Sequence, residues 1–472
     1  MHNIIKNSIY LYFILVSFHS FGQATEAKLQ KAFAVFQLDA QLQNAMTSLY
    51  VIDARTGKIV FDKNSTIGLA PASTQKIITT ATAYELLGKN FRYKTEWYYN
   101  GTIQNGVLNG NLMMKGSGDP TFGSWRYAST KREAILNELQ TQLKAKGINA
   151  IKGNVYLDES SFAFQPLPGG WMWDDIGNYY GAGSWAINWN ENQYDLVLKP
   201  GNKEGDTVAI VAMNSQPYGV SLYNQITTGA KGSGDNGYIY LAPYSSFGFT
   251  DGTIPLQANN FTISGSLPYP AATFSKELED FLRKNFGFAD SIKVYTDKLN
   301  NNTEWSQQDQ LLFTHYSPSL DSIIYWIDKR SINLYGEALA KTFAYEKNGF
   351  GSTDKGVELI KNYWQDKGIA ITELNMVDGS GLSPLNRVTT HAQVTILQYA
   401  KKQNWFKGFY YALPEYNKMK MKSGTINGVK GFCGYQTSKN GNEYIFSFLV
   451  NNYNGSASSL VNKMYRVLDI LK

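Results

Sequence analysis

Residues 71–76 read Pro-Ala-Ser-Thr-Gln-Lys, and a helical stretch runs on from them to Leu87, with Gly88 as its stop signal. Ser73 therefore lies in the first turn of a helix, where the positive end of the helix dipole favours a developing negative charge on the hydroxyl oxygen. Lys76 lies three residues on and thus on the same face, within reach of that hydroxyl. A neutral Lys76 could accept the Ser73 proton, and burial or a second cation nearby would favour the neutral form.

The Ser-x-x-Lys pattern is weak evidence by itself, because the spacing should occur about twice by chance in a chain of ordinary composition and this length. A second copy does occur, formed by Ser352 and Lys355. It immediately precedes a helical stretch at 353–367, so we interpret Ser352 as the cap of an ordinary surface helix. Other motifs elsewhere in the chain are needed to distinguish Ser73, as a candidate nucleophile, from Ser352.

Two further motifs follow Ser73 in order. Ser331-Ile332-Asn333 offers a hydroxyl that could pass a proton toward a leaving group and an amide that could hold a substrate amide. The plain structural interpretation of Ser331 is a helix N-cap, and both roles can hold together. Lys422-Ser423-Gly424-Thr425 is the only Lys-[Ser/Thr]-Gly sequence, and we expect it on a strand at the edge of the site. Its ammonium and hydroxyls suit a terminal carboxylate, and Gly424 would let the strand approach a substrate closely.

Hydrophobic periodicity predicts helices and antiparallel strands on both sides of a long insertion. Before the insertion we expect a helix over 25–47 and a hairpin at 48–61. After it we expect helices at 320–329, 334–345, 353–367, 389–402 and 457–471 and strands at 431–436 and 444–451. The fold class is therefore α+β. The predicted organisation is a signal peptide at 1–24, a catalytic domain formed by 25–88 plus 291–472, and two nested β-rich modules inserted at 89–290.

Composition restricts the class of protein further. The chain is 43% hydrophobic and 17% charged, which is typical of globular proteins, and its net charge of +6 is not gathered into a nucleic-acid-binding stripe. Lys6 followed by an apolar run at 9–18 predicts a signal peptide, with a membrane anchor as the alternative. Cys433 is the only cysteine, which excludes an internal disulfide. We expect an exported, periplasmic protein with no cofactor, no metal, no nucleic-acid partner and no transmembrane segment in the mature chain.

The ordered set Ser-x-x-Lys, Ser-x-Asn and Lys-[Ser/Thr]-Gly resembles the motif set of penicillin-binding proteins and class A β-lactamases. Neighbouring residues are similar to those of the class C low-molecular-mass penicillin-binding proteins, the D-Ala-D-Ala carboxypeptidase/endopeptidase family. The similar blocks are PASTQK at 71–76, GSGDPTF at 116–122, WMWDDIGNYYGAG at 171–183, SINLYGEALAK at 331–341, VDGSGLSPLNRVT at 377–389 and KSGTINGVKGFCGY at 422–435. The gap of about 258 residues between Ser73 and Ser331 suits modules inserted there, whereas β-lactamases have far shorter gaps.

The resemblance implies a penicillin-binding/β-lactamase-like transpeptidase domain and a role for each motif residue. By analogy, Ser73 is the acylated nucleophile, Lys76 its base with Lys422 keeping it neutral, and Ser331 and Asn333 line the cleft. Ser423, Gly424 and Thr425 would bind the substrate, with the hydroxyls on its carboxylate and the N–H groups of Ser73 and Thr425 as the oxyanion hole. The sequence departs from the family at Ser423, where Thr is usual, and at Ile332, where a polar residue is common.

The predicted activity is cleavage of D-Ala-D-Ala bonds in peptidoglycan stem peptides, with muropeptides as substrate and β-lactams as covalent inhibitors. Alternatives are a non-catalytic murein-binding protein on the same fold and a serine esterase or β-lactamase. The segment from Asp378 to Ser383 could contact substrate directly or be a structural turn. Asp174 and Asp175 lack an evident third metal ligand and are expected to cap or bridge within the insertion.

Overall fold

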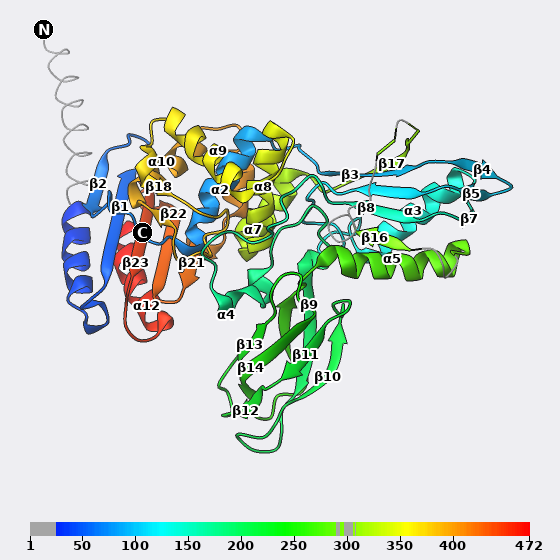
Figure 1. Cartoon of the computed structure of the whole chain (residues 1–472). Coiled ribbons are helices and arrows are strands. Elements are labelled where there is room, and N and C mark those ends of the chain that lie inside the picture. The colour runs from blue at the N-terminus through cyan, green and yellow to red at the C-terminus, as the bar shows by residue number, and fades with distance from the viewer. Residues whose placement is uncertain (1–24, 289–292, 297–304, 307) are drawn as a thin grey trace, which may run out of the picture.

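The computed structural model describes residues 25–288, 293–296, 305–306 and 308–472, so the predicted signal peptide at 1–24 lies outside the described residues. Figure 1 shows three parts, which we name after the predicted organisation: the catalytic part, a first inserted module that extends to the side, and a second inserted module that lies below. Helix α4 (Trp173–Ile176) lies between the catalytic part and the second module.

A six-stranded antiparallel sheet forms the centre of the catalytic part, in the order β2-β1-β23-β22-β21-β20. The strands are β1 (Met46–Asp53), β2 (Ile59–Lys63), β20 (Glu415–Tyr416), β21 (Met419–Ile426), β22 (Val429–Thr437) and β23 (Glu443–Asn451). Strands from the two ends of the chain thus pair directly. The predicted hairpin at 48–61 and the predicted strands near the C-terminus are all present.

Helices cover both faces of this sheet. One face carries α2 (Lys76–Leu86), α7 (Leu320–Arg330), α8 (Asn333–Asn348), α9 (Thr353–Asp366), α10 (Thr390–Lys401) and α11 (Phe406–Ala412), and the other carries the helix at 25–37 and α12 (Ala457–Leu468). Strand β1 shows why two layers form: Leu49 and Val51 pack into one core, and Tyr50 and Ile52 into the other. Alternate side chains point to opposite faces of a strand, so an uninterrupted apolar run needs cover on both sides.

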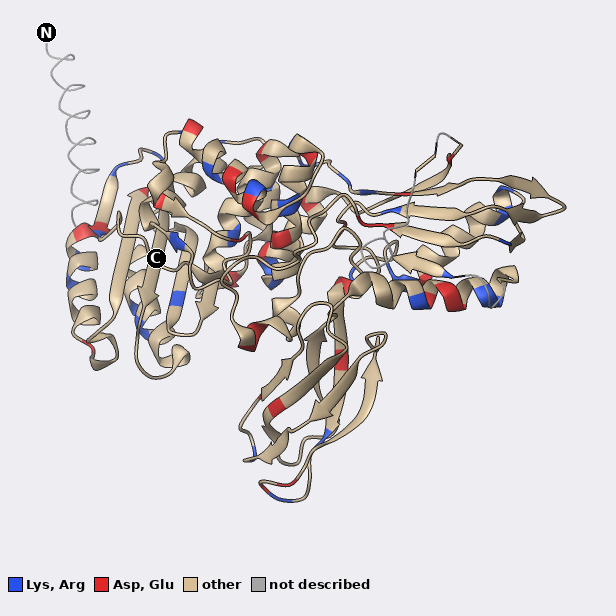
Figure 2. Cartoon of the chain, in the orientation of Figure 1, with Lys and Arg blue, Asp and Glu red and all other residues tan. Residues whose placement is uncertain are grey.

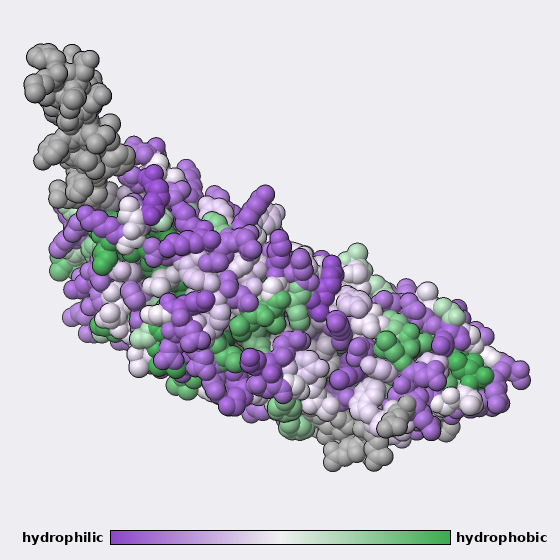
Figure 3. Space-filling view, turned by 90° about the horizontal axis from the view of Figure 1, so that it is seen from above, coloured by the Kyte–Doolittle hydropathy of each residue, from purple (hydrophilic) through white to green (hydrophobic). Residues whose placement is uncertain are grey.

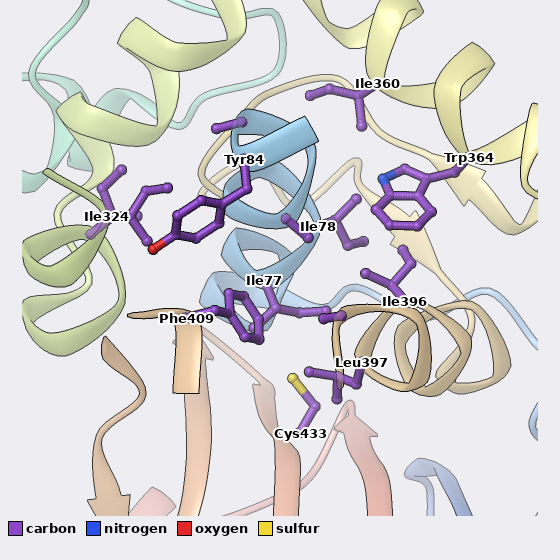
Figure 4. Close-up of a cluster of buried hydrophobic side chains, with 14 of the residues drawn as sticks. Ile77, Ile78, Tyr84, Ile324, Ile360, Trp364, Ile396, Leu397, Phe409 and Cys433 are labelled. Carbon is purple, nitrogen blue, oxygen red and sulfur yellow. The ribbon is translucent and has the colours of Figure 1, made fainter. Parts of the chain in front are cut away.

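Helix α2, which begins at Lys76, runs through the interior of the helical layer. Ile77 and Ile78 are fully buried, and Figure 4 shows them among Trp364 of α9, Ile396 of α10 and Phe409 of α11. Each such burial contributes roughly 1.5–3 kcal/mol of hydrophobic stabilisation. The helix is therefore held rigidly from all sides, and the residues at its start inherit a fixed position.

The first inserted module is a five-stranded sheet backed by two helices. Its strand order is β16-β8-β6-β3-β17, and a small sheet β4-β5-β7 extends it. The elements are β3 (Lys94–Tyr99), β4 (Thr102–Gln104), β5 (Val107–Asn109), β6 (Leu112–Lys115), α3 (Arg132–Ala145), β7 (Ala150–Ile151), β8 (Val155–Asp158), α5 (Pro270–Phe286), β16 (Val294–Thr296) and β17 (Gln310–Tyr316). The predicted division of the chain into domains stays a prediction. Strand β17 follows the predicted boundary at 290 in the chain, yet it pairs with β3 of the first inserted module.

The second module lies in the chain between β8 and α5 and has its own hydrophobic core. It contains one sheet of order β10-β9-β15 and another of order β11-β14-β12, with β13 also paired to β14. Its strands are β9 (Gln193–Lys199), β10 (Ala209–Asn214), β11 (Ser221–Asn224), β12 (Thr227–Gly229), β13 (Asn236–Tyr240), β14 (Phe247–Pro255) and β15 (Phe261–Ser266). The remaining elements are a short pair, β18 (Leu374–Asn375) with β19 (Arg387–Val388), and the 3-10 turns η1 (Ala40–Leu42), η2 (Ala72–Gln75), η3 (Tyr179–Gly181), η4 (Asn190–Asn192), η5 (Ile371–Glu373) and η6 (Asp469–Leu471).

Two elements differ from the sequence-based expectations. The first helix ends at residue 37, because β1 already begins at Met46. Helix α5 goes beyond the β-rich structure predicted for the insertion; Phe274, Leu278 and Leu282 recur four residues apart and form its buried face.

The surface is mixed in charge and hydropathy. Lys, Arg, Asp and Glu are interspersed over the catalytic part, and the second module carries few of them (Figure 2). Seen from above, the molecule is mostly hydrophilic with separate hydrophobic patches (Figure 3). Within the described ranges, no helix combines the length and the apolar character needed to cross a membrane.

Candidate active site

Ser73 lies on the 3-10 turn η2, which leads directly into α2. The turn is held in an unusual conformation, because the preceding Ala72 is fully buried with a φ of +46°. A left-handed conformation at a non-glycine residue is strained, and such strain persists only where the surrounding structure enforces it. Here Gly381 packs so closely on Ala72 that an added Cβ would lie 2.0 Å from the Ala72 carbonyl oxygen. The nucleophile candidate is thus presented by a constrained turn.

Lys76 is fully buried, and its amine makes three polar contacts. Its Nζ lies 3.0 Å from Ser73 Oγ, 2.6 Å from Asn333 Oδ1 and 2.7 Å from the Ser380 carbonyl oxygen. A neutral amine has two N–H donors and one lone pair, so the amide and the carbonyl can accept the two hydrogens. The lone pair is then free to accept the Ser73 proton. This geometry supplies the Ser–Lys pair that the spacing in the sequence predicts.

The environment of Lys76 favours its neutral form. Burial, and secondly the nearby Lys422 cation, together lower the pKa of the Lys76 ammonium from 10.5 to about 7. The carboxylates of Asp378, Glu337 and Asp328 oppose the shift by stabilising the charged form. About half of the Lys76 side chains are therefore neutral near pH 7, as proton transfer from Ser73 requires.

Lys422 lies on β21 and is almost fully buried. Its Nζ donates to Ser331 Oγ at 2.8 Å and to the Ser423 carbonyl oxygen at 2.8 Å. Burial lowers the Lys422 pKa, and the fully buried carboxylate of Asp328 on α7 opposes this effect. The family resemblance implies the Lys422 cation near the Ser73–Lys76 pair, whereas Asp328 was not expected there.

Ser331 and Asn333 approach the site from the junction of α7 and α8. Ser331 ends α7 with a left-handed φ of +58°, and Ile332 is the N-cap of α8. The interpretation of Ser331 as a helix N-cap is therefore wrong. Ser331 is the C-cap of α7 and lies one residue before the N-cap of α8, because the turn between the two helices is sharp. Asn333 uses both ends of its amide: Oδ1 accepts from Lys76, and Nδ2 donates to the Tyr180 carbonyl oxygen at 2.7 Å.

The Lys-Ser-Gly-Thr segment of β21 packs against η2. Gly424 is buried there, and a Cβ at this position would lie 2.8 Å from the Thr74 nitrogen and 2.9 Å from the Ser73 nitrogen. Only glycine allows the strand to come this close to the turn. Thr425 is exposed toward the cleft, and its hydroxyl accepts a hydrogen bond from Lys430 of the neighbouring strand at 2.7 Å. Lys430 was not predicted.

Two buried carboxylates hold the loop that contacts Lys76. Asp378 is fully buried and accepts hydrogen bonds from Gln75 Nε2, Trp171 Nε1, Asn386 Nδ2 and the backbone N–H groups of Gly381 and Ser383. Glu337 accepts from the N–H groups of Gly379 and Ser380. Asp378–Ser383 had two interpretations, a substrate contact or a structural turn. The hydrogen bonds of the Asp378 side chain are those of a structural turn, and the Ser380 carbonyl oxygen accepts from the amine of Lys76.

The cleft beside Ser73 has a volume of about 1190 Å³ and is shared by the catalytic part and the insertion. Ser73, Ser331, Asn333 and Thr425 line one side, together with Ile332. The inserted residues that line it include Asp174, Asp175, Tyr180 and Tyr238. Asp174 and Asp175, which belong to α4, thus line the cleft. Among the residues described, no third His, Cys, Asp or Glu lies with them as a possible metal ligand.

The second Ser-x-x-Lys copy lies elsewhere. Ser352 is the N-cap of α9, and the Lys355 ammonium pairs with Glu358 on the same helix. All eight predicted site residues, in contrast, lie at or beside the cleft: Ser73, Lys76, Ser331, Asn333, Lys422, Ser423, Gly424 and Thr425. The structure therefore separates the two copies as their positions in the chain suggest.

Comparison with known proteins agrees with this geometry. The sequence profile of the D-Ala-D-Ala carboxypeptidase 3 (S13) family matches residues 29–469. The chain is similar to D-alanyl-D-alanine carboxypeptidase DacB of Haemophilus influenzae, with 26% identity over 430 residues, 87% of this chain and 85% of that protein. It is also similar to the D-alanyl-D-alanine carboxypeptidase of Actinomadura sp., with 25% identity over 446 residues, 89% of this chain and 80% of that protein.

A solved structure shares the fold. The crystal structure of penicillin binding protein 4 from Haemophilus influenzae superposes with a TM-score of 0.76 at 23% identity, covering 94% of this chain and 98% of that one. A second structure of that protein, complexed with a β-lactam, gives a TM-score of 0.72 at 23% identity, covering 91% and 97%. With the family profile spanning almost the whole described chain, this protein belongs to the D-Ala-D-Ala carboxypeptidase 3 (S13) family, a serine peptidase family of the class C low-molecular-mass penicillin-binding proteins.

Proposed function

We propose that this protein cleaves the D-Ala-D-Ala bond of peptidoglycan stem peptides through an acyl-enzyme on Ser73. Ser73 Oγ attacks the carbonyl carbon while its proton passes to Lys76 Nζ. D-Ala departs as its nitrogen gains a proton, and water then hydrolyses the ester to release the shortened peptide and free Ser73. The observation that carries this proposal is the Lys76 amine, 3.0 Å from Ser73 Oγ with a pKa of about 7.

The other residues of the cleft have roles that follow from their contacts. Lys422 donates to Ser331 Oγ, so this pair can relay a proton to the leaving nitrogen. The hydroxyls of Ser423 and Thr425 can bind the terminal carboxylate beside the Lys422 and Lys430 cations. The backbone N–H groups of Ser73 and Thr425 would stabilise the oxyanion.

Cleavage of cross-linked peptides would use the same chemistry with a larger leaving amine. The cleft of about 1190 Å³, with one wall from the inserted module, offers space beyond a single D-Ala. Such a substrate lies outside the cytoplasm, and the predicted signal peptide supports export to the periplasm.

Fluorescent penicillin tests the nucleophile. Wild type should be labelled covalently, because a β-lactam traps the acyl-enzyme, and Ser73→Ala should not be labelled. Ser352→Ala is the matched control, since it removes the serine of the other Ser-x-x-Lys copy. Labelling that survives Ser73→Ala would refute the assignment. Mass spectrometry of muropeptides before and after treatment then separates D-Ala release from cleavage of cross-links.

A further inference from the structure

A sheet surface rich in aromatic side chains lies on the second inserted module. Strand β14 pairs with β13 on one side and β11 on the other, and the register places Tyr240 beside Phe249 and Phe249 beside Tyr223. Ile239 and Thr250, which alternate with these residues, are buried on the inner face. The rings therefore share the outer face of the sheet. We call this surface the aromatic face; its members are Trp173, Tyr223, Tyr238, Tyr240, Phe247 and Phe249.

Four rings of the aromatic face, those of Trp173, Tyr238, Tyr240 and Phe249, contact one another in series, and Tyr223 and Phe247 extend the face on the neighbouring strand positions. The Trp173 and Tyr240 centroids are 5.7 Å apart, and Tyr240 and Phe249 are stacked at 4.7 Å. Several members remain open to solvent, with exposed fractions of 62% for Phe247, 60% for Tyr223 and 47% for Trp173. Scattered exposed apolar residues are common, but a contiguous group on adjacent strands marks a binding surface.

This surface is nearly uncharged. Asp251 is the only charged residue of β11, β13 and β14, and the ribbon of the second module carries few charges in Figure 2. Burial raises the pKa of the Tyr240 hydroxyl, and the nearby carboxylates of Asp174 and Asp251 raise it further. The aromatic face thus combines neutral rings, tyrosine hydroxyls and carboxylate acceptors at its margin.

The aromatic face is continuous with the cleft that contains Ser73. Tyr238 belongs to both, and Asp174 and Asp175 of α4 line the cleft next to Trp173. A ligand that leaves the cleft past Tyr238 and Asp174 therefore reaches the aromatic face. A long substrate with its reacting end at Ser73 could therefore lie across it.

We propose that the aromatic face binds the glycan strand of peptidoglycan, a chain of amino sugars, while the attached stem peptide occupies the cleft. This inference rests on the proposed function. The C–H faces of sugar rings carry partial positive charge and pack on the negative faces of aromatic rings. Tyrosine hydroxyls and carboxylates exchange hydrogen bonds with sugar hydroxyls. Adjacent strands lie about 4.8 Å apart, close to the length of one sugar ring in such a chain.

Peptide-free glycan strands, prepared from peptidoglycan with an amidase, are the direct probe. Isothermal titration calorimetry should detect binding to wild type and to Ser73→Ala alike, so the result does not depend on catalysis. The double variant Tyr223→Ala/Phe247→Ala should bind about tenfold more weakly or worse, since each ring contributes as an aromatic contact does. Neither residue lines the cleft, so both penicillin labelling and cleavage of a free stem peptide should stay at the wild-type rate. Cleavage of intact sacculi should fall.

Tyr218→Ala is the matched control. Tyr218 is a 57% exposed tyrosine of the same module, and its backbone N–H contacts Thr273 of α5 instead of the aromatic face. Its glycan affinity should equal that of wild type. No binding of peptide-free strands by wild type, or equal binding by wild type and the double variant, would overturn the inference and would favour a protein partner for this surface. Failure of the proposed function would appear separately, as penicillin labelling that does not require Ser73.

Discussion

Replacement of Lys422 by methionine should raise the pKa of Lys76 and shift the pH dependence of acylation. In the folded protein the pKa of Lys76 is lowered to about 7, first by burial and second by the Lys422 cation. An ordinary lysine with a pKa of 10.5 is neutral in only about one molecule in 3,000 at pH 7, compared with about half for Lys76.

The expected magnitude follows from the share that a neighbouring charge can supply. A nearby charge moves a pKa by about one to three units, so loss of the Lys422 cation should raise the Lys76 pKa by about one unit at the lower end of that range. In Lys422→Met the Lys76 pKa should then be about 8. At pH 7 the neutral fraction falls from about half to about a tenth, so acylation should be roughly fivefold slower, and roughly tenfold slower at pH 6.

The assay is the second-order rate of penicillin acylation from pH 5.5 to 10. Lys76 acts as a base only when neutral, so the rate should rise tenfold per pH unit below its pKa and then bend to a plateau. In wild type the rate should fall again at higher pH, because burial lowers the Lys422 pKa as well and the neutral amine binds the penicillin carboxylate less well. The wild-type profile should bend near pH 7, and the Lys422→Met profile about one unit higher. Any loss of carboxylate binding lowers the plateau without moving the bend, which separates the two roles of Lys422. A bend at the same pH in both proteins would refute the electrostatic role of Lys422.

Three further changes test the surroundings of the site. Asp328→Asn removes the carboxylate that stabilises the Lys422 cation, so the Lys422 pKa should fall. Because neutral Lys422 binds a carboxylate less well, the apparent KM for a peptide with a free carboxylate should rise more steeply with pH above 7 than in wild type. Gly424→Ala places a methyl group under 3 Å from the amide nitrogens of the nucleophile turn, and penicillin labelling should drop at least about a hundredfold, since a displacement of 1 Å can cost that much. Trp171→Phe removes one of the hydrogen bonds to Asp378, and the free energy of unfolding in urea should decrease by about 1–3 kcal/mol, because Oδ2 of this buried carboxylate keeps the Ser383 N–H but loses its other donor. An unchanged urea midpoint would contradict that role.

Local sequence signals predicted most of the catalytic part correctly. The hairpin formed by β1 and β2, the helices α7 to α10 and the strands β22 and β23 follow directly from hydrophobic periodicity and turn residues. Helix α5 carries the same type of signal, with Leu278 and Leu282 on one face. It was not predicted, because turn residues are frequent in the sequence that precedes it. The conformation of Ser331 could not be predicted, because its left-handed φ results from the packing of α7 against α8.

The amino-acid sequence by itself determined which groups could react and in what order they occur. The spacing of Ser73 and Lys76 on one helical face is a local property, and the two later motifs distinguish Ser73 from Ser352. The pKa of Lys76, in contrast, depends on burial and on Lys422, which is 346 positions away in the chain. Only the tertiary structure brings these charges together and excludes water from them.

The same distinction applies to two carboxylates whose contacts with the site the sequence did not reveal. Asp378 and Glu337 look like ordinary loop and helix residues, yet in the fold they hold the loop whose carbonyl accepts from Lys76. Desolvation strengthens every such contact, because charges and dipoles interact more strongly where water is excluded. The chemistry of the groups is therefore encoded locally, whereas their protonation and orientation are properties of the packed structure.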